Sequence, residues 1–181
     1  FKNINSRTSN IEKKEKNKKA LVEETLLAKY DQYYRLAYRY AHEEADAFDI
    51  VQSGACKAIR SSHTLRNEEY VQTWLYRIML NECFQYLKQP KHLSYEAMQD
   101  EKGRHADATE DHYADVDLQR ALNALADKDR AVIILKYFED RKISEIAEIL
   151  DENENTVKSR LYRSMKKLQV ILSDGQNGKV W

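Results

Sequence analysis

Apolar side chains recur every three or four residues through the first half of the chain, the spacing that places them on one face of a helix. The pattern runs over residues 21–87 and is interrupted near residues 42–46 and 61–69. Pro90 follows shortly afterwards, and proline ends a helix because it lacks an amide donor and crowds the residue before it. We therefore predict a first helical domain over residues 21–90.

A second helical domain is predicted over residues 115–173. It opens with a helix that carries Leu118, Leu122 and Leu125 on one face, and the apolar run AVIILKYF predicts the next helix. Between the two domains, residues 91–114 are polar and lack sustained periodicity, which is typical of a linker. The predicted fold class is therefore all-α, with two small helical domains joined by a flexible acidic linker.

The end of the second domain has the pattern of a helix-turn-helix. Residues 143–150 predict a short packing helix, residues 151–154 interrupt its pattern, and a longer helix follows with Asn153 and Asn155 as candidate caps. Its predicted buried stripe is Val157, Leu161, Met165 and Leu168. Its outward face gathers cations and hydroxyl groups, namely Lys158, Ser159, Tyr162, Arg163, Lys166 and Lys167. Such a face suits phosphates and base edges in a major groove, and the alternative is a solvated hairpin of another α-bundle.

A polar ridge lies within the first domain. Asp46, Asp49 and Gln52 repeat every three residues, so one side of a helix carries two carboxylates and an amide while apolar residues face elsewhere. This ridge would suit a cationic protein partner, although an ordinary solvated face is the alternative from these residues alone.

The segment after the ridge combines aromatic and cationic residues. A polar loop over residues 66–69 precedes a helix in which rings and cations alternate, a combination that can stack unpaired bases and hold a single-stranded backbone. We predict that Trp74 packs in the core. The residues of this helix predicted to be exposed are Tyr76, Arg77 and Asn81.

Composition supports helices and shows where charge is concentrated. Charged residues make up 33% of the 181 residues, with four glycines and one proline, which favours helices over sandwiches or barrels. The 30 basic and 30 acidic residues cancel, so charge acts locally. Residues 1–20 carry seven Lys or Arg against two Glu and are predicted to be a disordered basic extension, whereas residues 96–117 carry eight acids against two bases. Residues 174–181 are predicted to be a tail.

The sequence contains no recognisable catalytic or metal-binding pattern. Cys56 and Cys83 are isolated thiols within helical patterns and are predicted to be buried and reduced, which favours a cytoplasmic location. Neither they nor the five histidines have the spacing of metal ligands, and there is no phosphate-binding glycine loop. We therefore expect no enzyme, no metal or other cofactor, and no small-molecule substrate. No apolar run approaches membrane-spanning length.

Three motifs follow one another along the chain: DAFDIVQ at residues 46–52, TWLYRI at residues 73–78, and ISEIAEIL with NTVKSRLYRSMKKL at residues 143–168. In this order they resemble bacterial RNA polymerase sigma factors of the extracytoplasmic-function (ECF) group. The first motif is similar to the region-two helix that docks on the polymerase clamp helices, and the second to the promoter-melting helix. The third is similar to the region-four helix-turn-helix that reads the −35 element.

The resemblance implies a cytoplasmic sigma factor that binds core RNA polymerase, recognises the −35 and −10 promoter elements and initiates transcription of a stress or cell-envelope regulon. The implied polymerase-binding residues are Asp46, Asp49 and Gln52. For the melted −10 strand, from which one base is flipped out, the implied binding residues are Arg66, Asn67, Glu68, Glu69, Tyr76, Arg77 and Asn81. Those implied for the duplex −35 element are Thr156, Lys158, Ser159, Tyr162, Arg163, Lys166 and Lys167.

Within the −35 set, Arg163 is the best candidate for a guanine contact, and Lys166 and Lys167 are expected to hold phosphates. The resemblance also implies an anti-sigma factor as a partner, often membrane-bound, that covers the polymerase- and DNA-binding faces. Two other classes of protein stay open from the residues alone. A helix-turn-helix repressor or response-regulator output domain would explain only the second domain, and a helical interaction protein would not bind DNA.

The sequence departs from the family pattern at three places, one of which is the basic tract after the melting helix, reduced here to Lys88, Lys91 and His92. Asp151 and Glu152 stand where the turn usually has glycine followed by an aliphatic residue. Aspartate tolerates a left-handed backbone, so we expect the turn to survive, but an aliphatic anchor is lost. QSGAC at residues 52–56 replaces the acidic and bulky residues that usually follow the docking helix's glutamine.

Overall fold

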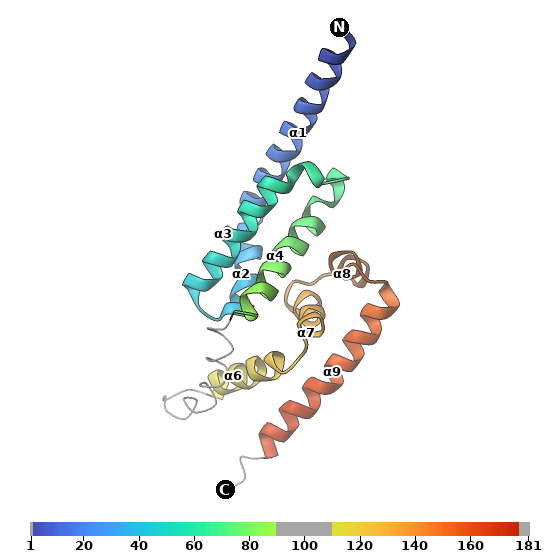
Figure 1. Ribbon diagram of the computed structural model, residues 1–181. Coiled ribbons are helices and arrows are strands. Elements are labelled where there is room, and N and C mark those ends of the chain that lie inside the picture. The colour runs from blue at the N-terminus through green and yellow to red at the C-terminus, as the bar shows by residue number, and fades with distance from the viewer. Residues whose placement is uncertain (1, 90–109, 178–181) are drawn as a thin grey trace. The chain divides into compact units, whose positions relative to one another are not determined.

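The computed structural model describes residues 2–89 and 110–177, and every regular element in these ranges is a helix (Figure 1). The chain divides into two compact units, Phe1–Leu87 and Lys88–Trp181. The first unit contains helices α1 (Lys2–Ala28), α2 (Tyr30–Ala41), α3 (Glu44–Ser61) and α4 (Val71–Leu87), and the short 3-10 turns η1 (Ser62–Thr64) and η2 (Glu68–Tyr70). The second contains α6 (Glu110–Asn123), α7 (Asp127–Ile133), the π-helical turn η3 (Ile134–Phe138), α8 (Ile143–Leu150) and α9 (Glu154–Asn177). The predicted all-α, two-domain class is confirmed.

Three predicted segments differ from the structure or lie outside it. The predicted linker lies outside the described residues from residue 91 to residue 109, and α6 already begins at Glu110. Helix α9 continues to Asn177, four residues into the predicted tail. Residues 1–20 were expected to be disordered, whereas α1 begins at Lys2. The reason is that α1 is anchored at its other end by the buried Val22, and no proline or glycine stops its propagation toward the N-terminus.

Helices α2, α3 and α4 pack against one another and form the core of the first unit, while α1 contacts α3, α4 and η1. The largest side chains fully buried there are Tyr33, Leu36, Leu65, Leu75, Tyr76, Met79 and Leu80. Gly54 lets α3 approach α4 closely, because a Cβ at this position would collide with the sulfur of Met79. This packing explains the glycine of QSGAC.

The first predicted break in the helical pattern is a left-handed C-cap. Helix α2 ends at Ala41, and His42 has φ 57°, with its N–H donating to the Tyr38 carbonyl at 2.8 Å. This is one of the bonds that satisfy the last carbonyls of a helix. The second predicted break contains η1 and η2.

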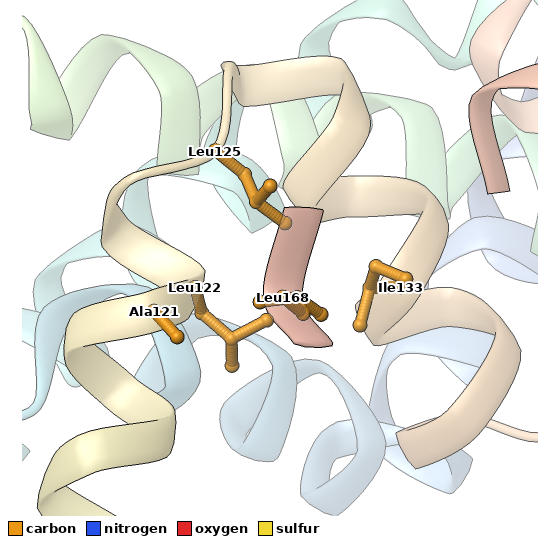
Figure 2. Close-up of a cluster of buried hydrophobic side chains, with 5 residues drawn as sticks. All are labelled: Ala121, Leu122, Leu125, Ile133 and Leu168. Atoms are coloured by element: carbon orange, nitrogen blue, oxygen red, sulfur yellow. The ribbon is translucent and has the colours of Figure 1, made fainter. Parts of the chain in front are cut away.

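A separate apolar cluster forms the core of the second unit (Figure 2). Side chains from α6, α7 and α9 point toward one another there, so helices far apart in the sequence are joined. The buried members are Ala121, Leu122, Leu125, Ile133 and Leu168, and Leu118, Phe138, Leu161, Ile171 and Leu172 pack around them. The predicted apolar face of Leu118 and Leu122 on α6 is therefore confirmed, whereas Leu125, predicted on the same helix, enters the cluster from the turn after α6, which ends at Asn123.

The predicted buried stripe of α9 is wrong at one position. Val157 and Leu168 are buried, but Met165 is 41% exposed and Ser164 is buried in its place. Each step of four residues turns a helix by about 40° more than a full circle, so two such steps from Val157 carry Met165 off the buried face. Steps of four, seven and eleven residues stay on that face and lead through Leu161 and Ser164 to Leu168.

Helix α8 has the bounds predicted for the first helix of the helix-turn-helix, and Asp151 ends it with φ 55° and ψ 48°. The N–H of Glu152 donates to the Ala147 carbonyl at 2.9 Å, the long backbone bond of a Schellman motif. Helix α9 then starts after Asn153, whose Oδ1 accepts the Thr156 N–H at 2.8 Å. Of the two candidate caps, Asn153 is therefore the one used, and the left-handed aspartate is confirmed.

An ionic cluster takes the place of the missing aliphatic anchor in this turn. Arg160 of α9 donates to both carboxylate oxygens of Glu152, each at 3.0 Å, and to Asp129 of α7 at 2.6 Å. Lys128 donates to Glu152 at 2.8 Å. The hydrogen bonds from Arg160, followed by the contact with Lys128, lower the pKa of Glu152 from 4.5 to about 2. The cluster therefore joins the turn, α7 and α9 through charged groups that are mostly shielded from water.

We expect Glu152→Gln to destabilise the second unit in a pH-dependent way. Because the pKa of Glu152 is depressed on folding, its stabilisation is fully present above about pH 4.5 and is lost as the pH falls toward 2. The shift corresponds to at most about 3 kcal/mol at pH 7. Urea titrations at pH 7 and pH 3, followed by methyl NMR signals of Ile133 and Ile146, measure the unfolding free energy.

The matched control for this experiment is Glu154→Gln. Glu154 forms only an exposed pair with Lys158, at 3.8 Å, so its loss should cost less than about 0.5 kcal/mol at either pH. A difference between wild type and Glu152→Gln that is the same at pH 7 and pH 3 would contradict the ionic origin of the anchor.

Candidate nucleic-acid and protein interfaces

The polar ridge predicted on the first unit lies on the surface of α3. Asp49 and Gln52 are exposed and Asp46 is half-buried. The hydroxyl of Tyr86, on α4, donates to Asp46 Oδ2 at 2.7 Å and fixes the direction of this carboxylate. The ridge thus combines one oriented carboxylate with two freely accessible polar groups.

Cys56 extends this ridge, because it follows Gln52 by four residues and is exposed. The prediction that Cys56 is buried is wrong, and the prediction for Cys83, on α4, is confirmed. The error arose because Cys56 lies beside the apolar Ala55, whereas the helical phase is set by the buried Gly54 and Ala58.

The residues behind the ridge hold α3 against α4 through a buried carboxylate. Glu82 accepts a hydrogen bond from the Ser53 hydroxyl at 2.6 Å and pairs with Lys57 through its other oxygen. Sequence reasoning missed this group, since Glu82 lies among apolar residues whose pattern gives no sign of a charge partner 25 residues away. Its effect is to keep the α3 ridge in a fixed position on α4.

An apolar cavity of about 440 Å³ opens beside the ridge, between α1, α2 and α3. Leu27 and Phe48 line it although they are 80% and 51% exposed, and Gln52 belongs to both the cavity and the ridge. The other lining residues are Glu23, Leu26, Tyr30, Tyr33, Val51, Ala55 and Ile59. The sequence signal for this cavity is the apolar Phe48, which lies between the ridge residues Asp46 and Asp49 in the sequence.

The predicted strand-binding loop, Arg66 to Glu69, is exposed at all four positions. Asn67 organises it, because its Oδ1 accepts the Glu69 N–H at 3.1 Å and so caps η2. On α4, Arg77 and Asn81 are exposed as predicted. The loop and the two α4 side chains therefore all face solvent.

The predicted exposure of Tyr76 is wrong. Its side chain is only 1% exposed, its ring meets Tyr33 edge-on with centroids 5.3 Å apart, and its hydroxyl donates to Gln32 at 3.4 Å. The aromatic ring available next to the loop is instead that of Tyr70, which is 47% exposed, and Trp74 is half-buried. The buried side of α4 is wider than one stripe because α4 packs against both α2 and α3.

The basic face of α9 forms the third surface. Its N-terminal part has a concavity lined by Asn155, Thr156, Lys158, Ser159, Tyr162 and Arg163. Five of these six residues belong to the predicted −35 set, and Tyr162 is 72% exposed. The side chain of Thr156 is partly engaged in the cap, because its hydroxyl donates to Asn153 at 3.0 Å.

The cations of α9 differ in how they are held. Lys158 makes only the exposed pair with Glu154, and Lys166 is exposed. Lys167 donates to the backbone carbonyl of Ala124 at 2.9 Å, so this lysine also links α9 to the end of α6. Substituting Lys166 therefore tests a DNA contact without disturbing the fold, whereas substituting Lys167 would also remove the link to α6.

Comparison with known families covers both units. The Sigma-70 region 2 family matches residues 26–92, and the Sigma-70 region 4 family matches residues 115–168. The chain belongs to the sigma-70 family. The ridge, the exposed loop and every residue that lines the cavity except Glu23 lie in region 2, and the helix-turn-helix lies in region 4.

Relatives place this sigma factor in the ECF group. It is 40% identical to the RNA polymerase sigma factor SigV of Bacillus subtilis over 167 residues, which cover 89% of this chain and 96% of that protein. It is 30% identical to the ECF RNA polymerase sigma factor SigW of the same organism, over 80% of this chain and 84% of SigW. Sigma factors of this group direct promoter recognition and transcription initiation, and so does this one.

Solved structures share the fold. One is the sigma factor RpoE in complex with the anti-sigma factor NepR from Bartonella quintana, with a TM-score of 0.60 and 22% identity over 83% of this chain and 96% of RpoE. Another is CnrH in complex with the cytosolic domain of CnrY, with a TM-score of 0.62 and 19% identity over 84% of this chain and 88% of CnrH.

Residues 2–89 and 110–177 contain neither a candidate metal site nor a candidate membrane-spanning helix. Among them, no three His, Cys, Asp or Glu side chains are grouped in a way that could hold a metal ion. In the same ranges, no helix is both long enough and apolar enough to cross a lipid bilayer.

Proposed function

We propose that this ECF sigma factor docks on core RNA polymerase through the ridge of Asp46, Asp49 and Gln52, and reads the two promoter elements through its other two exposed surfaces. The observation that carries the proposal is the concavity on α9, which gathers five predicted −35 residues on one helix after a helix-turn-helix turn. In this role the protein acts by binding and positioning in the cytoplasm, with no covalent chemistry of its own. The regulon proposed is one of stress or cell-envelope genes.

The ridge supports docking on a cationic protein surface. Asp49 and Gln52 are accessible, and Tyr86 holds the Asp46 carboxylate in one direction, so less freedom is lost when a partner binds. The Glu82 cluster behind the ridge keeps α3 in place. Complementary charges across such an interface chiefly fix its register and exclude other partners.

The loop from Arg66 to Glu69, together with Tyr70, Arg77 and Asn81, supports capture of the melted −10 strand. Unstacking a base costs a few kcal/mol, which stacking on an aromatic ring and a shaped pocket can offset. Tyr70 takes the stacking role that the sequence had given to Tyr76, because Tyr70 is the exposed ring adjoining the loop.

The face of α9 supports readout of the duplex −35 element. Arg163 is exposed and its guanidinium can donate two hydrogen bonds to guanine O6 and N7. Lys158, Ser159 and Tyr162 lie beside it in the concavity. Lys166 and Lys167 would contact phosphates, which position the helix and carry no base information.

An anti-sigma factor, often a membrane-bound protein in this group, is the proposed regulatory partner. One solved relative is bound to an anti-sigma factor, and the cavity between α1, α2 and α3 offers an apolar surface beside the polymerase ridge. Because Gln52 belongs to both, a helix that filled this cavity would also cover part of the ridge. Anti-sigma factor and polymerase would then exclude each other.

Asp49→Arg is expected to abolish polymerase binding without unfolding the chain, because Asp49 is exposed and a reversed charge in a docked pair costs several kcal/mol. Co-purification with core polymerase and run-off transcription measure the effect. The exposed Cys56 offers an independent check, since core polymerase should slow its reaction with a maleimide. The buried Cys83 is the internal control, and unchanged reactivity of Cys56 in the holoenzyme would contradict docking on this ridge.

Tyr70→Ala is expected to weaken binding of the holoenzyme to a single-stranded −10 oligonucleotide by about 1–3 kcal/mol, the usual value for one stacked base. Tyr70→Phe keeps the ring and should bind almost as wild type. Fluorescence anisotropy with −10 and scrambled oligonucleotides measures both variants. Equal losses for the two variants would show that the ring does not stack on a base.

Arg163→Ala should cost about 1–3 kcal/mol and relax the preference at one −35 position, since it removes a bidentate base contact. Lys166→Ala should instead weaken binding on every sequence and lower the salt slope by about one unit. Holoenzyme binding to specific and scrambled −35 duplexes over a salt series separates the two effects. If Arg163→Ala weakens both duplexes equally, this arginine does not read bases.

A further inference from the structure

The N-terminal half of α1 is a basic helix outside the matched family regions, because the region 2 match begins at residue 26. Residues 12–19 contain five lysines against two glutamates, in a chain whose total charge is zero. All of these side chains are exposed except Lys18, which is half-buried. The packing of the first unit does not require so many cations here, because Val22 is the first buried residue among residues 12–28 of α1.

The fold places this basic helix beside the segment that leads into the −10 loop. Lys18 Nζ donates to the backbone carbonyl of His63, at 3.4 Å, and α1 packs along η1. Arg66 follows His63 by three residues. In Figure 1, α1 runs along α3 and continues past the end at which α3 leads into η1.

The lysines before Lys18 extend this basic surface along the helix axis. Since an α-helix rises 1.5 Å per residue, Lys14 lies about 6 Å beyond Lys18 and is on the same side of the helix. At about 100° per residue, Lys13 lies about 100° around the helix from Lys14 and Lys16 a further 60° in the same direction, so the three lysines occupy one half of the helix circumference. Arg60 and Arg66 add exposed cations from the end of α3 and from the loop, whereas Lys19 is paired with Glu23 at 3.8 Å.

We propose that Lys13, Lys14 and Lys16 form a DNA-phosphate site that holds promoter DNA flanking the −10 element. The inference rests on the proposed role of the Arg66–Glu69 loop, because that loop would bring a polyanion next to these lysines. Lysines on flexible stems are point charges that match phosphates without reading sequence. The site therefore adds salt-dependent, sequence-independent affinity at the place where the strand is opened.

The test uses holoenzyme assembled from core polymerase and the full chain. Lys13→Gln/Lys14→Gln/Lys16→Gln removes three positive charges while keeping good helix formers. Three probes carry the same single-stranded −10 element: one with minimal flanks, one with added duplex upstream and one with added single strand downstream. For the triple lysine variant we expect about tenfold weaker binding at low salt, and a slope of log affinity against log salt that is lower by about 2–3 units. This loss should appear on the one extended probe, upstream or downstream, that carries the phosphates held by the lysines.

Glu12→Gln/Glu15→Gln is the matched control, since it removes the negative charges of the same two turns. It should strengthen binding to that extended probe. If the helix acts electrostatically, removing negative charges must raise the affinity for DNA where removing positive charges lowers it, whereas a purely structural role predicts no such reversal. Lys14→Gln alone should lower the salt slope by about one unit. Circular dichroism of the free variants checks that α1 stays helical.

Equal affinity and equal salt slope for the lysine variant and wild type on all three probes would overturn the inference. So would a loss confined to holoenzyme assembly, which would mean that the lysines face an acidic surface of polymerase. Tyr70→Ala tests the −10 assignment separately. Loss of −10 binding in Tyr70→Ala with an unchanged lysine variant leaves the proposed function standing and refutes the phosphate site. The reverse result refutes the stacking role of Tyr70 and leaves the phosphate site standing.

Discussion

The helices of this sigma factor depend on burying one side against their neighbours, because isolated helices shorter than about 12–15 residues are marginal in water. Helix α8 has only eight residues, and four of them, Ile146, Ala147, Ile149 and Leu150, are buried. Packing therefore divides each helix into a side that holds the fold and a side that is left for partners. The ridge on α3, the exposed residues of α4 and the basic face of α9 are the sides left over.

Region 4 shows how much of the fold the sequence could predict. The bounds of α8, the left-handed Asp151 and the apolar face of Leu118 and Leu122 followed from local rules that act within one or two turns. Met165 and Tyr76 were misplaced for a different reason. Their burial depends on the exact phase of a long helix and on how many neighbours it packs against, and neither quantity is encoded in a single apolar stripe.

The candidate sites were predictable in outline but not in detail. Exposure of Asp49, Arg77 and Arg163 follows from helical periodicity, whereas Tyr70, the apolar cavity and the Glu82 cluster arise from contacts between helices. The ionic cluster of Arg160 also joins residues 31 positions apart, so the sequence could show that an aliphatic anchor was missing but not what replaced it. The basic composition of residues 1–20 likewise predicted disorder. The helix there depends on the burial of Val22, a tertiary effect that the sequence does not show.

The hydrogen bond between Tyr86 and Asp46 ties two positions 40 residues apart in the sequence. Phenylalanine at position 86 would remove the hydrogen bond that the half-buried carboxylate accepts, and an apolar residue at position 46 would remove this acceptor of the tyrosine hydroxyl. Each single change therefore costs free energy that the corresponding double change can recover. Across natural variants of this protein, the two positions are under a joint constraint and should vary together.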